Sequence, residues 1–161
     1  YRYIAGALIA GSIVGYFAAT KVKMTSMPEM VAIFNGFGGI ASLLVGSAEY
    51  VSGTFDNPAF LGAIFFTVLI GGMTFTGSII AYGKLSERLK LGKGSWITNV
   101  LISFFYLSIP ALVYVIFEPS LSSVIPTVPS YFLFFVGLTL LAGLGFVTPI
   151  GGGDMPVVIY F

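Results

Sequence analysis

The chain alternates between long apolar stretches and short connections rich in polar residues, glycine or proline. The apolar stretches are Tyr3–Ala19, Pro28–Glu49, Phe60–Tyr82, Trp96–Phe117 and Tyr131–Val147, and Val157–Phe161 begins another. A helix needs roughly 20 apolar residues to cross the hydrocarbon core of a bilayer. The pattern therefore predicts an all-α, polytopic membrane helix bundle of five transmembrane helices plus the start of a sixth. Residues 1–161 would form a single transmembrane domain.

Small and polar residues recur on one face of the second and third predicted helices. With 3.6 residues per turn, the first seam comprises Asn35, Gly39, Ser42, Gly46 and Glu49. The second seam comprises Thr67, Gly71, Thr74, Ser78 and Tyr82. In lipid, such a face turns toward other helices or toward water. Two seams of matching character predict a shared internal contact.

Several of these polar residues also have plain structural explanations. A hydroxyl such as that of Thr67 commonly bonds the carbonyl four residues back in its own helix. The Asn35 amide could simply bridge two helices, or it could hold a water chain through its donor and acceptor. Glu29, in the first turn of its helix, could serve only to complement the helix dipole. Asp154, also at a predicted helix end, has the same alternative.

Two glycine motifs suggest nucleotide or anion binding at first sight. Gly36, Gly38 and Ala41 match G-x-G-x-x-A, but the apolar run continues through them and no βαβ unit follows. We therefore interpret these glycines as contact surface for a neighbouring helix. Gly151–Asp154 could cradle an anion or form a re-entrant turn, and no Lys-Ser or Lys-Thr follows to make a P-loop.

Composition narrows the possible functions. Hydrophobic residues make up 57% of the chain and charged residues 8%, far below the charge of about 25% typical of a soluble domain. The chain has neither cysteine nor histidine, so disulfides, the commonest general base and the commonest metal ligand are missing, and we expect no metal site. The net charge of +1, without a basic block, gives no reason to expect nucleic acid as a partner.

Basic residues mark alternate connections, which predicts the orientation of the helices. The connections after the second and fourth helices have no lysine or arginine. Those after the first and third carry Lys21, Lys23, Lys84, Arg88, Lys90 and Lys93. By the positive-inside rule, these two connections and the Gly151–Asp154 turn should face the cytoplasm or matrix. The chain begins without Met and ends at what looks like a helix start, so we read it as an internal piece of a longer protein.

Three separated blocks together resemble one protein family. MTSMPEMVAIFNGFGG, TFTGSIIAYGKL and PIGGGDMPVVI are similar, in this order, to the membrane domain of proton-translocating nicotinamide nucleotide transhydrogenase, in its beta-subunit portion. The resemblance covers Lys21–Phe161, and the connections between the blocks match weakly. It implies an enzyme that transfers hydride from NADH to NADP⁺ and couples this to proton translocation.

The resemblance also implies what surrounds this chain. NADP(H) and NAD(H) would be bound by other domains of the enzyme, and none would be bound directly here. No catalytic residue for hydride transfer would lie in this chain. Its partners would be membrane lipid, alpha-subunit membrane helices, the NADP(H)-binding and NAD(H)-binding domains, and a second copy in a homodimer. The expected location is the bacterial plasma membrane or the mitochondrial inner membrane.

The resemblance assigns roles to individual residues. Ser78 matches a family serine on the channel side and Glu29 matches the acid after proline, so with Asn35 and Ser42 they would line the proton path. Asp154, with Gly151, Gly152 and Gly153, matches the turn near the NADP(H) domain and would couple to it. Many members carry histidine where this chain has Asn35. Because the chain lacks histidine, we expect another part of the enzyme to supply it.

Two other classes of protein remain open on the residues alone. A secondary transporter would bind its substrate near the midplane, usually at a broken helix. A structural membrane subunit would use the glycine-rich faces only for packing, and the acidic glycine turn would then be unexplained. Further sequence beyond Phe161 would separate these possibilities, since an NADP(H) fingerprint is expected only of the transhydrogenase.

Overall fold

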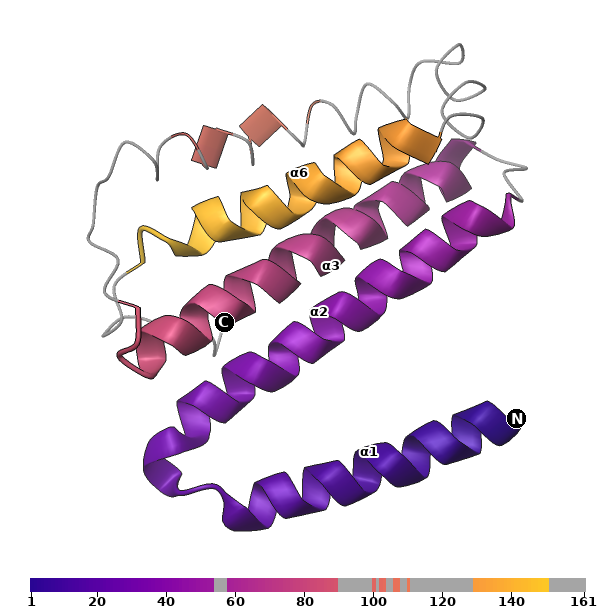
Figure 1. Cartoon of the computed structure of the whole chain (residues 1–161). Helices are drawn as coiled ribbons and strands as arrows, with labels where there is room; N and C mark the ends of the chain where they lie inside the picture. The colour runs from indigo at the N-terminus through magenta and orange to yellow at the C-terminus, as the bar shows by residue number, and fades with distance from the viewer. Residues whose placement is uncertain are drawn as a thin grey trace.

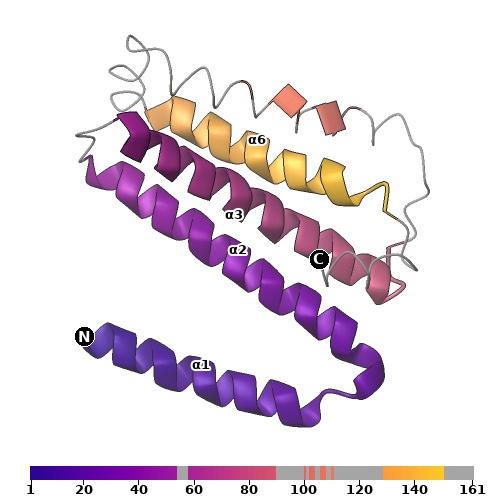
Figure 2. The ribbon, with the colours of Figure 1, turned by 180° about the vertical axis from the view of Figure 1, so that it is seen from behind.

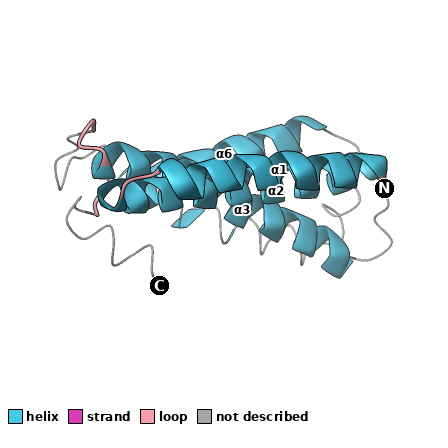
Figure 3. Cartoon of the chain, turned by 90° about the horizontal axis from the view of Figure 1, so that it is seen from below, coloured by secondary structure: helices cyan, strands magenta, loops and turns pink. Residues whose placement is uncertain are grey.

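The computed structural model describes residues 1–53, 58–89 and 129–150, with a few positions between 100 and 110. Within these residues the chain consists of helices and short turns, without a strand (Figure 3). The helices are α1 (Arg2–Lys21), α2 (Met27–Ser52), α3 (Pro58–Leu85) and α6 (Pro129–Val147), and the 3-10 turn η1 (Met24–Ser26) precedes α2. The all-α prediction is confirmed for this part of the chain.

The helices coincide with four of the predicted apolar stretches, each extended by a few residues. Three are long and apolar enough to cross a membrane, over Arg2–Lys21, Met24–Ser52 and Ala59–Leu85, and Tyr131–Val147 is a shorter apolar helix. The described part is therefore consistent with a membrane helix bundle. Most of the predicted fourth span, Trp96–Phe117, and all of Val157–Phe161 lie outside the described residues.

Local sequence explains where α2 begins and ends. Pro28 lies in the first turn, where its missing N–H costs no helical hydrogen bond. Glu29 lies in the same turn and complements the positive end of the helix dipole. At the other end Gly53 takes a left-handed conformation, with φ of 72°, which glycine adopts without the steric penalty of a side chain.

Helix α3 lies between α2 and α6 (Figures 1 and 2). It runs antiparallel to α2, since Gly46 of α2 meets the early residue Val68 and Gly36 meets the later residue Ser78. It runs parallel to α6. Phe65, early in α3, meets Phe132, early in α6, and Lys84, in the last turn of α3, contacts Val147, the last residue of α6. The end of α3, the end of α6 and the start of α2 therefore lie at the same end of the bundle.

An aromatic cluster packs the opposite end of the bundle. Tyr50 of α2 stacks on Phe132 of α6 with ring centroids 3.9 Å apart, and Phe65 of α3 meets both rings edge-on. Such aromatic pairs contribute beyond the area they bury. Helix α1 is different, because it has no buried residue, and Figure 1 shows it next to α2 but apart from it.

Candidate functional site

Asn35 and Ser78 meet across the interface between α2 and α3. The Asn35 side-chain amide donates a hydrogen bond to the Ser78 hydroxyl, with Nδ2 and Oγ 3.0 Å apart. Gly36 makes this approach possible, because a Cβ at that position would lie 3.2 Å from the Cβ of Ser78. The structure thus brings together two residues that the sequence placed on separate seams.

Glycines let the same two helices come close along their length. A Cβ on Gly39 would lie 2.6 Å from the backbone nitrogen of Phe75, and one on Gly71 would lie 2.6 Å from that of Leu43. A Cβ on Gly46 would lie 2.7 Å from the side chain of Val68. Small residues are expected where two membrane helices approach this closely. The two glycines of the G-x-G-x-x-A motif differ in their surroundings. A Cβ on Gly36 would contact α3, whereas a Cβ on Gly38 would have no atom within 4 Å.

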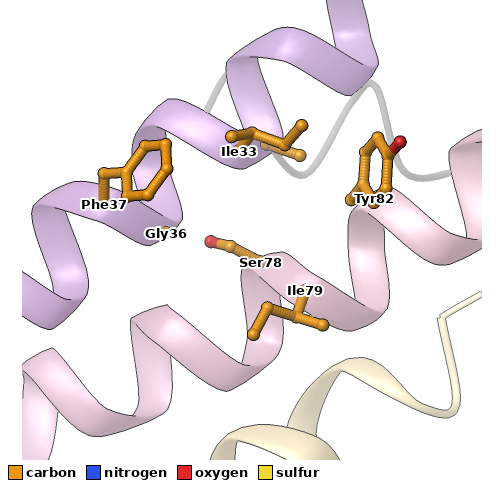
Figure 4. A pocket seen from close by; sticks show the side chains of 7 residues that line it. Ile33, Gly36, Phe37, Ser78, Ile79 and Tyr82 are labelled. Atoms are coloured by element: carbon orange, nitrogen blue, oxygen red, sulfur yellow. The ribbon is translucent and has the colours of Figure 1, made fainter.

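A small hollow of about 140 Å³ lies between α2 and α3, with Ser78 in its lining (Figure 4). It is lined by Ala32, Ile33, Gly36, Phe37, Ser78, Ile79 and Tyr82. Figure 4 shows the Ser78 hydroxyl directed toward α2. The other walls are largely apolar, and apolar cavities do not hold water without two to four polar partners. The hollow is therefore an apolar space next to the buried Ser78 hydroxyl, which is already bonded to Asn35.

The Asn35 side chain keeps hydrogen-bonding capacity in reserve. Asn35 is exposed in the isolated chain, although its amide nitrogen is engaged with Ser78. Among the described residues its Oδ1 has no hydrogen-bond donor. An amide offers two donors and two acceptor sites, so Asn35 can bond Ser78 and a further group at once.

The remaining predicted site residues lie as follows. Ser42 is half-buried and donates to the carbonyl of Gly38 in its own helix, at 3.1 Å. Thr67 likewise donates to the carbonyl of Ala63, four residues back in α3, which confirms the structural explanation for this hydroxyl. Glu29 is half-buried in the first turn of α2. Gly151, Gly152, Gly153 and Asp154 lie outside the described residues.

Sequence reasoning missed a second polar face on α3, which contacts α6. Thr76 donates to the carbonyl of Leu140, with Oγ1 and O 2.8 Å apart. A Cβ on Gly143 would meet Thr76 and the backbone of Met73, and one on Gly72 would meet Thr139. The signal was present in the adjacent small residues at 71 and 72, since two neighbouring glycines on a helix must face different directions.

The assignment of Lys84 to a polar connection was wrong. Helix α3 continues to Leu85, and Lys84 lies in its last turn with only 7% of its surface exposed. Its ammonium group donates to the carbonyls of Val147, Thr148 and Ile150 at distances of 3.1, 2.5 and 2.7 Å. Val147 is the last residue of α6, and Thr148 and Ile150 lie in the turn after it, where carbonyls have no partner within the helix and a cation satisfies them well.

Long apolar helices with small residues and a few polar bonds at their interfaces are typical of polytopic membrane proteins. Comparison with known proteins narrows this class. The family model described as NAD(P) transhydrogenase beta subunit matches residues 1–161. The chain belongs to this family.

Two relatives agree with that assignment. The NAD(P) transhydrogenase subunit beta of Rhodospirillum rubrum is 33% identical over 169 residues, which include 99% of this chain. The protein of the same name from one strain of that organism matches equally well. The chain spans 35% of the length of these relatives.

Proposed function

We propose that this chain is the proton-channel membrane part of an NAD(P) transhydrogenase. The complete enzyme would transfer hydride from NADH to NADP⁺ and couple this transfer to proton movement across the membrane. The observation that carries the proposal is the hydrogen bond between the Asn35 and Ser78 side chains, inside an interface where glycines, apolar side chains and threonines also meet. Polar side chains within a membrane-spanning helix are costly, and in membrane proteins they often mark transport paths.

The chemistry of hydride transfer belongs to other parts of this enzyme in our proposal. NADP(H) and NAD(H) would be bound by separate nucleotide-binding domains, and the membrane part would be completed by alpha-subunit helices and a second enzyme copy. Family membership and the similarity to a subunit named beta support such partners. The helices of membrane-spanning length support an integral membrane location, in a bacterial plasma membrane or the mitochondrial inner membrane.

The proton would be carried along this path by a group that Asn35 holds in place. An amide does not titrate near neutral pH, but it can orient a water or an imidazole through its Oδ1. We propose that a histidine from another chain approaches Asn35, which the Ser78 hydroxyl holds in place. Ser42 and Glu29 would line the same path, Glu29 at its cytoplasmic or matrix end.

A bundle of five spans plus the start of a sixth fits the helix directions. Because α3 and α6 are parallel, the end of α3 and the start of α6 lie at opposite ends of the bundle. Two parallel helices require an odd number of membrane crossings between them. One crossing by Trp96–Phe117 satisfies this requirement.

Proton pumping by the assembled enzyme in liposomes tests the proposal. Asn35→Leu keeps the bulk and removes both hydrogen-bonding groups, so proton translocation should fall strongly while hydride exchange between the isolated nucleotide domains stays unchanged. Asn35→His should retain partial activity, because it restores a titratable group at this position. Pumping by Asn35→Leu at the parent rate, at matched expression, would show that the bond serves packing only.

The turn at Gly151–Asp154 would communicate with the NADP(H)-binding domain. In the same assay Asp154→Asn keeps the size of the side chain and removes its charge. We expect coupled transhydrogenation to fall while the bundle still assembles. Normal coupled turnover in this variant would mean that the carboxylate acts only as a charge at a helix end.

A further inference from the structure

The ammonium group of Lys84 is fully engaged by the end of a different helix. Its three donors correspond to three carbonyl acceptors, those of Val147, Thr148 and Ile150. A buried ammonium group is costly unless its donors are all satisfied, so this arrangement holds only while α6 ends where it does. The contact is therefore specific to one register of α6 against α3.

Lys84 also offsets an electrostatic cost of the fold. Because α3 and α6 are parallel, their C-terminal ends, each with partial negative charge, lie side by side. Lys84 lies in the last turn of α3, and its ammonium group donates to Val147 at the end of α6 and to Thr148 and Ile150 just after it. One positive charge thus serves both helix ends.

We propose that Lys84 is a positioning residue that fixes the end of α6, and the turn that follows it up to Ile150, onto α3. Helix α3 also carries Ser78, six residues earlier, whose hydroxyl bonds Asn35. A displacement of α3 at the Asn35 contact is therefore transmitted to the end of α6 through the Lys84 contacts. This inference rests on the proposed function, because it assigns that contact a part in coupling.

A spin-label distance measurement in the assembled enzyme tests the positioning role without reference to activity. This chain has no cysteine, so after replacing cysteines elsewhere two introduced cysteines can be labelled specifically. Arg88 and Phe146 report on the end with Lys84, and Phe60 and Tyr131, exposed at the starts of α3 and α6, report on the other end. Lys84→Met should broaden the first distance distribution and leave the second unchanged.

The distance distributions of two Lys84 variants decide whether Lys84 fixes the end of α6. Lys84→Arg restores a cation with several donors and should recover most of the narrow distribution. An unchanged first distribution in Lys84→Met would overturn the proposal. Equal broadening of both distributions would also overturn it, since Lys84 would then support the whole bundle and not one end of it.

The coupling ratio, protons pumped per hydride transferred, tests the functional part. Lys84→Met should lose most of this ratio while hydride transfer continues, and Lys84→Arg should regain it. Lys21→Met is the matched control, because Lys21 also lies in the last turn of a helix but is exposed. If Lys84→Met broadens the distances yet pumps with a normal ratio, the coupling role is wrong. Loss of pumping in Asn35→Leu remains an independent test of the proposed function.

Discussion

The two interfaces of α3 are built from similar small residues but make their polar bonds differently. Toward α2, the bond joins two side chains, Asn35 and Ser78. Toward α6, Thr76 and Lys84 donate to backbone carbonyls. A backbone acceptor is fixed by its helix, whereas a side-chain acceptor can rotate and exchange its partner.

This difference separates a fixed helix pair from an adjustable one. Backbone acceptors hold α6 in one register on α3, so these two helices should move together. At the α2–α3 contact, the Asn35–Ser78 bond can be exchanged for a bond to water or to another side chain, because both of its partners are side chains. The polar exchange that a proton path requires therefore belongs to the α2 side.

The interface between α3 and α6 requires these two helices to run in the same direction across the membrane. A test of this topology should have the largest effect. Ser86 follows the end of α3, whereas Ser122 lies in the predicted connection between the fourth and fifth spans, outside the described residues. We expect an impermeant thiol reagent to label Ser86→Cys and Ser122→Cys from opposite sides of the membrane, with the first on the basic side. Equal labelling of both from one side would contradict the parallel arrangement of α3 and α6 in a five-span bundle.

A methyl group at an interfacial glycine should have the next largest effect. Gly39→Ala would place its Cβ 2.6 Å from the nitrogen of Phe75 and 2.9 Å from the carbonyl oxygen of Gly71. Since both are backbone atoms, the helices must separate, at a cost of about 1–3 kcal/mol in stability. Gly38→Ala is the control, because its Cβ would meet no atom and it gains helix propensity.

A matched pair of alanine variants on the other side of α3 extends this test. Gly143→Ala would bring its Cβ within 2.8 Å of the Cα of Met73, whereas Gly137→Ala would enter open space. Thermal unfolding of the purified enzyme in detergent measures all four variants. We expect a lower Tm only for the alanines at 39 and 143, and four equal values would mean that neither interface is close-packed.

The smallest effect should come from single hydroxyls. Thr76→Val removes the bond to the carbonyl of Leu140, which is worth about 0.6–1.5 kcal/mol in membrane and soluble proteins. Thr67→Val removes only a bond within α3 and should change stability by less. Unfolding free energies in denaturant would show the difference, and a larger loss in Thr67→Val would reverse our ranking.

Helical periodicity was enough to predict much of the α2–α3 interface. A period of 3.6 residues decides which positions share a face, so Asn35, Gly39 and Gly46 could be grouped from the amino-acid sequence. The same reasoning grouped Gly71 with Ser78. The structure adds that α2 and α3 are antiparallel at a register that opposes Asn35 to Ser78.

The interface with α6 could not be predicted in this way. The contacts of Thr76 and Gly143 depend on which helix lies next to α3 and in which direction it runs, and the distance of 64 residues between Thr76 and Leu140 carries no local signal. Lys84 was misplaced for a related reason. In the amino-acid sequence, a lysine after an apolar stretch indicates the start of a connection. Only the structure shows the carbonyls to which Lys84 donates.

The parallel pairing of α3 and α6 has a consequence for the order of assembly. Helices α2 and α3 follow each other along the chain and can pair as soon as both have entered the bilayer, whereas α6 is made much later. Until α6 arrives, the long side chain of Lys84 can reach the aqueous interface. We therefore expect a thiol reagent to label Lys84→Cys in nascent chains that end before Pro129 and to lose access once α6 is complete. Loss of labelling at position 84 would then report the packing of α6 against α3.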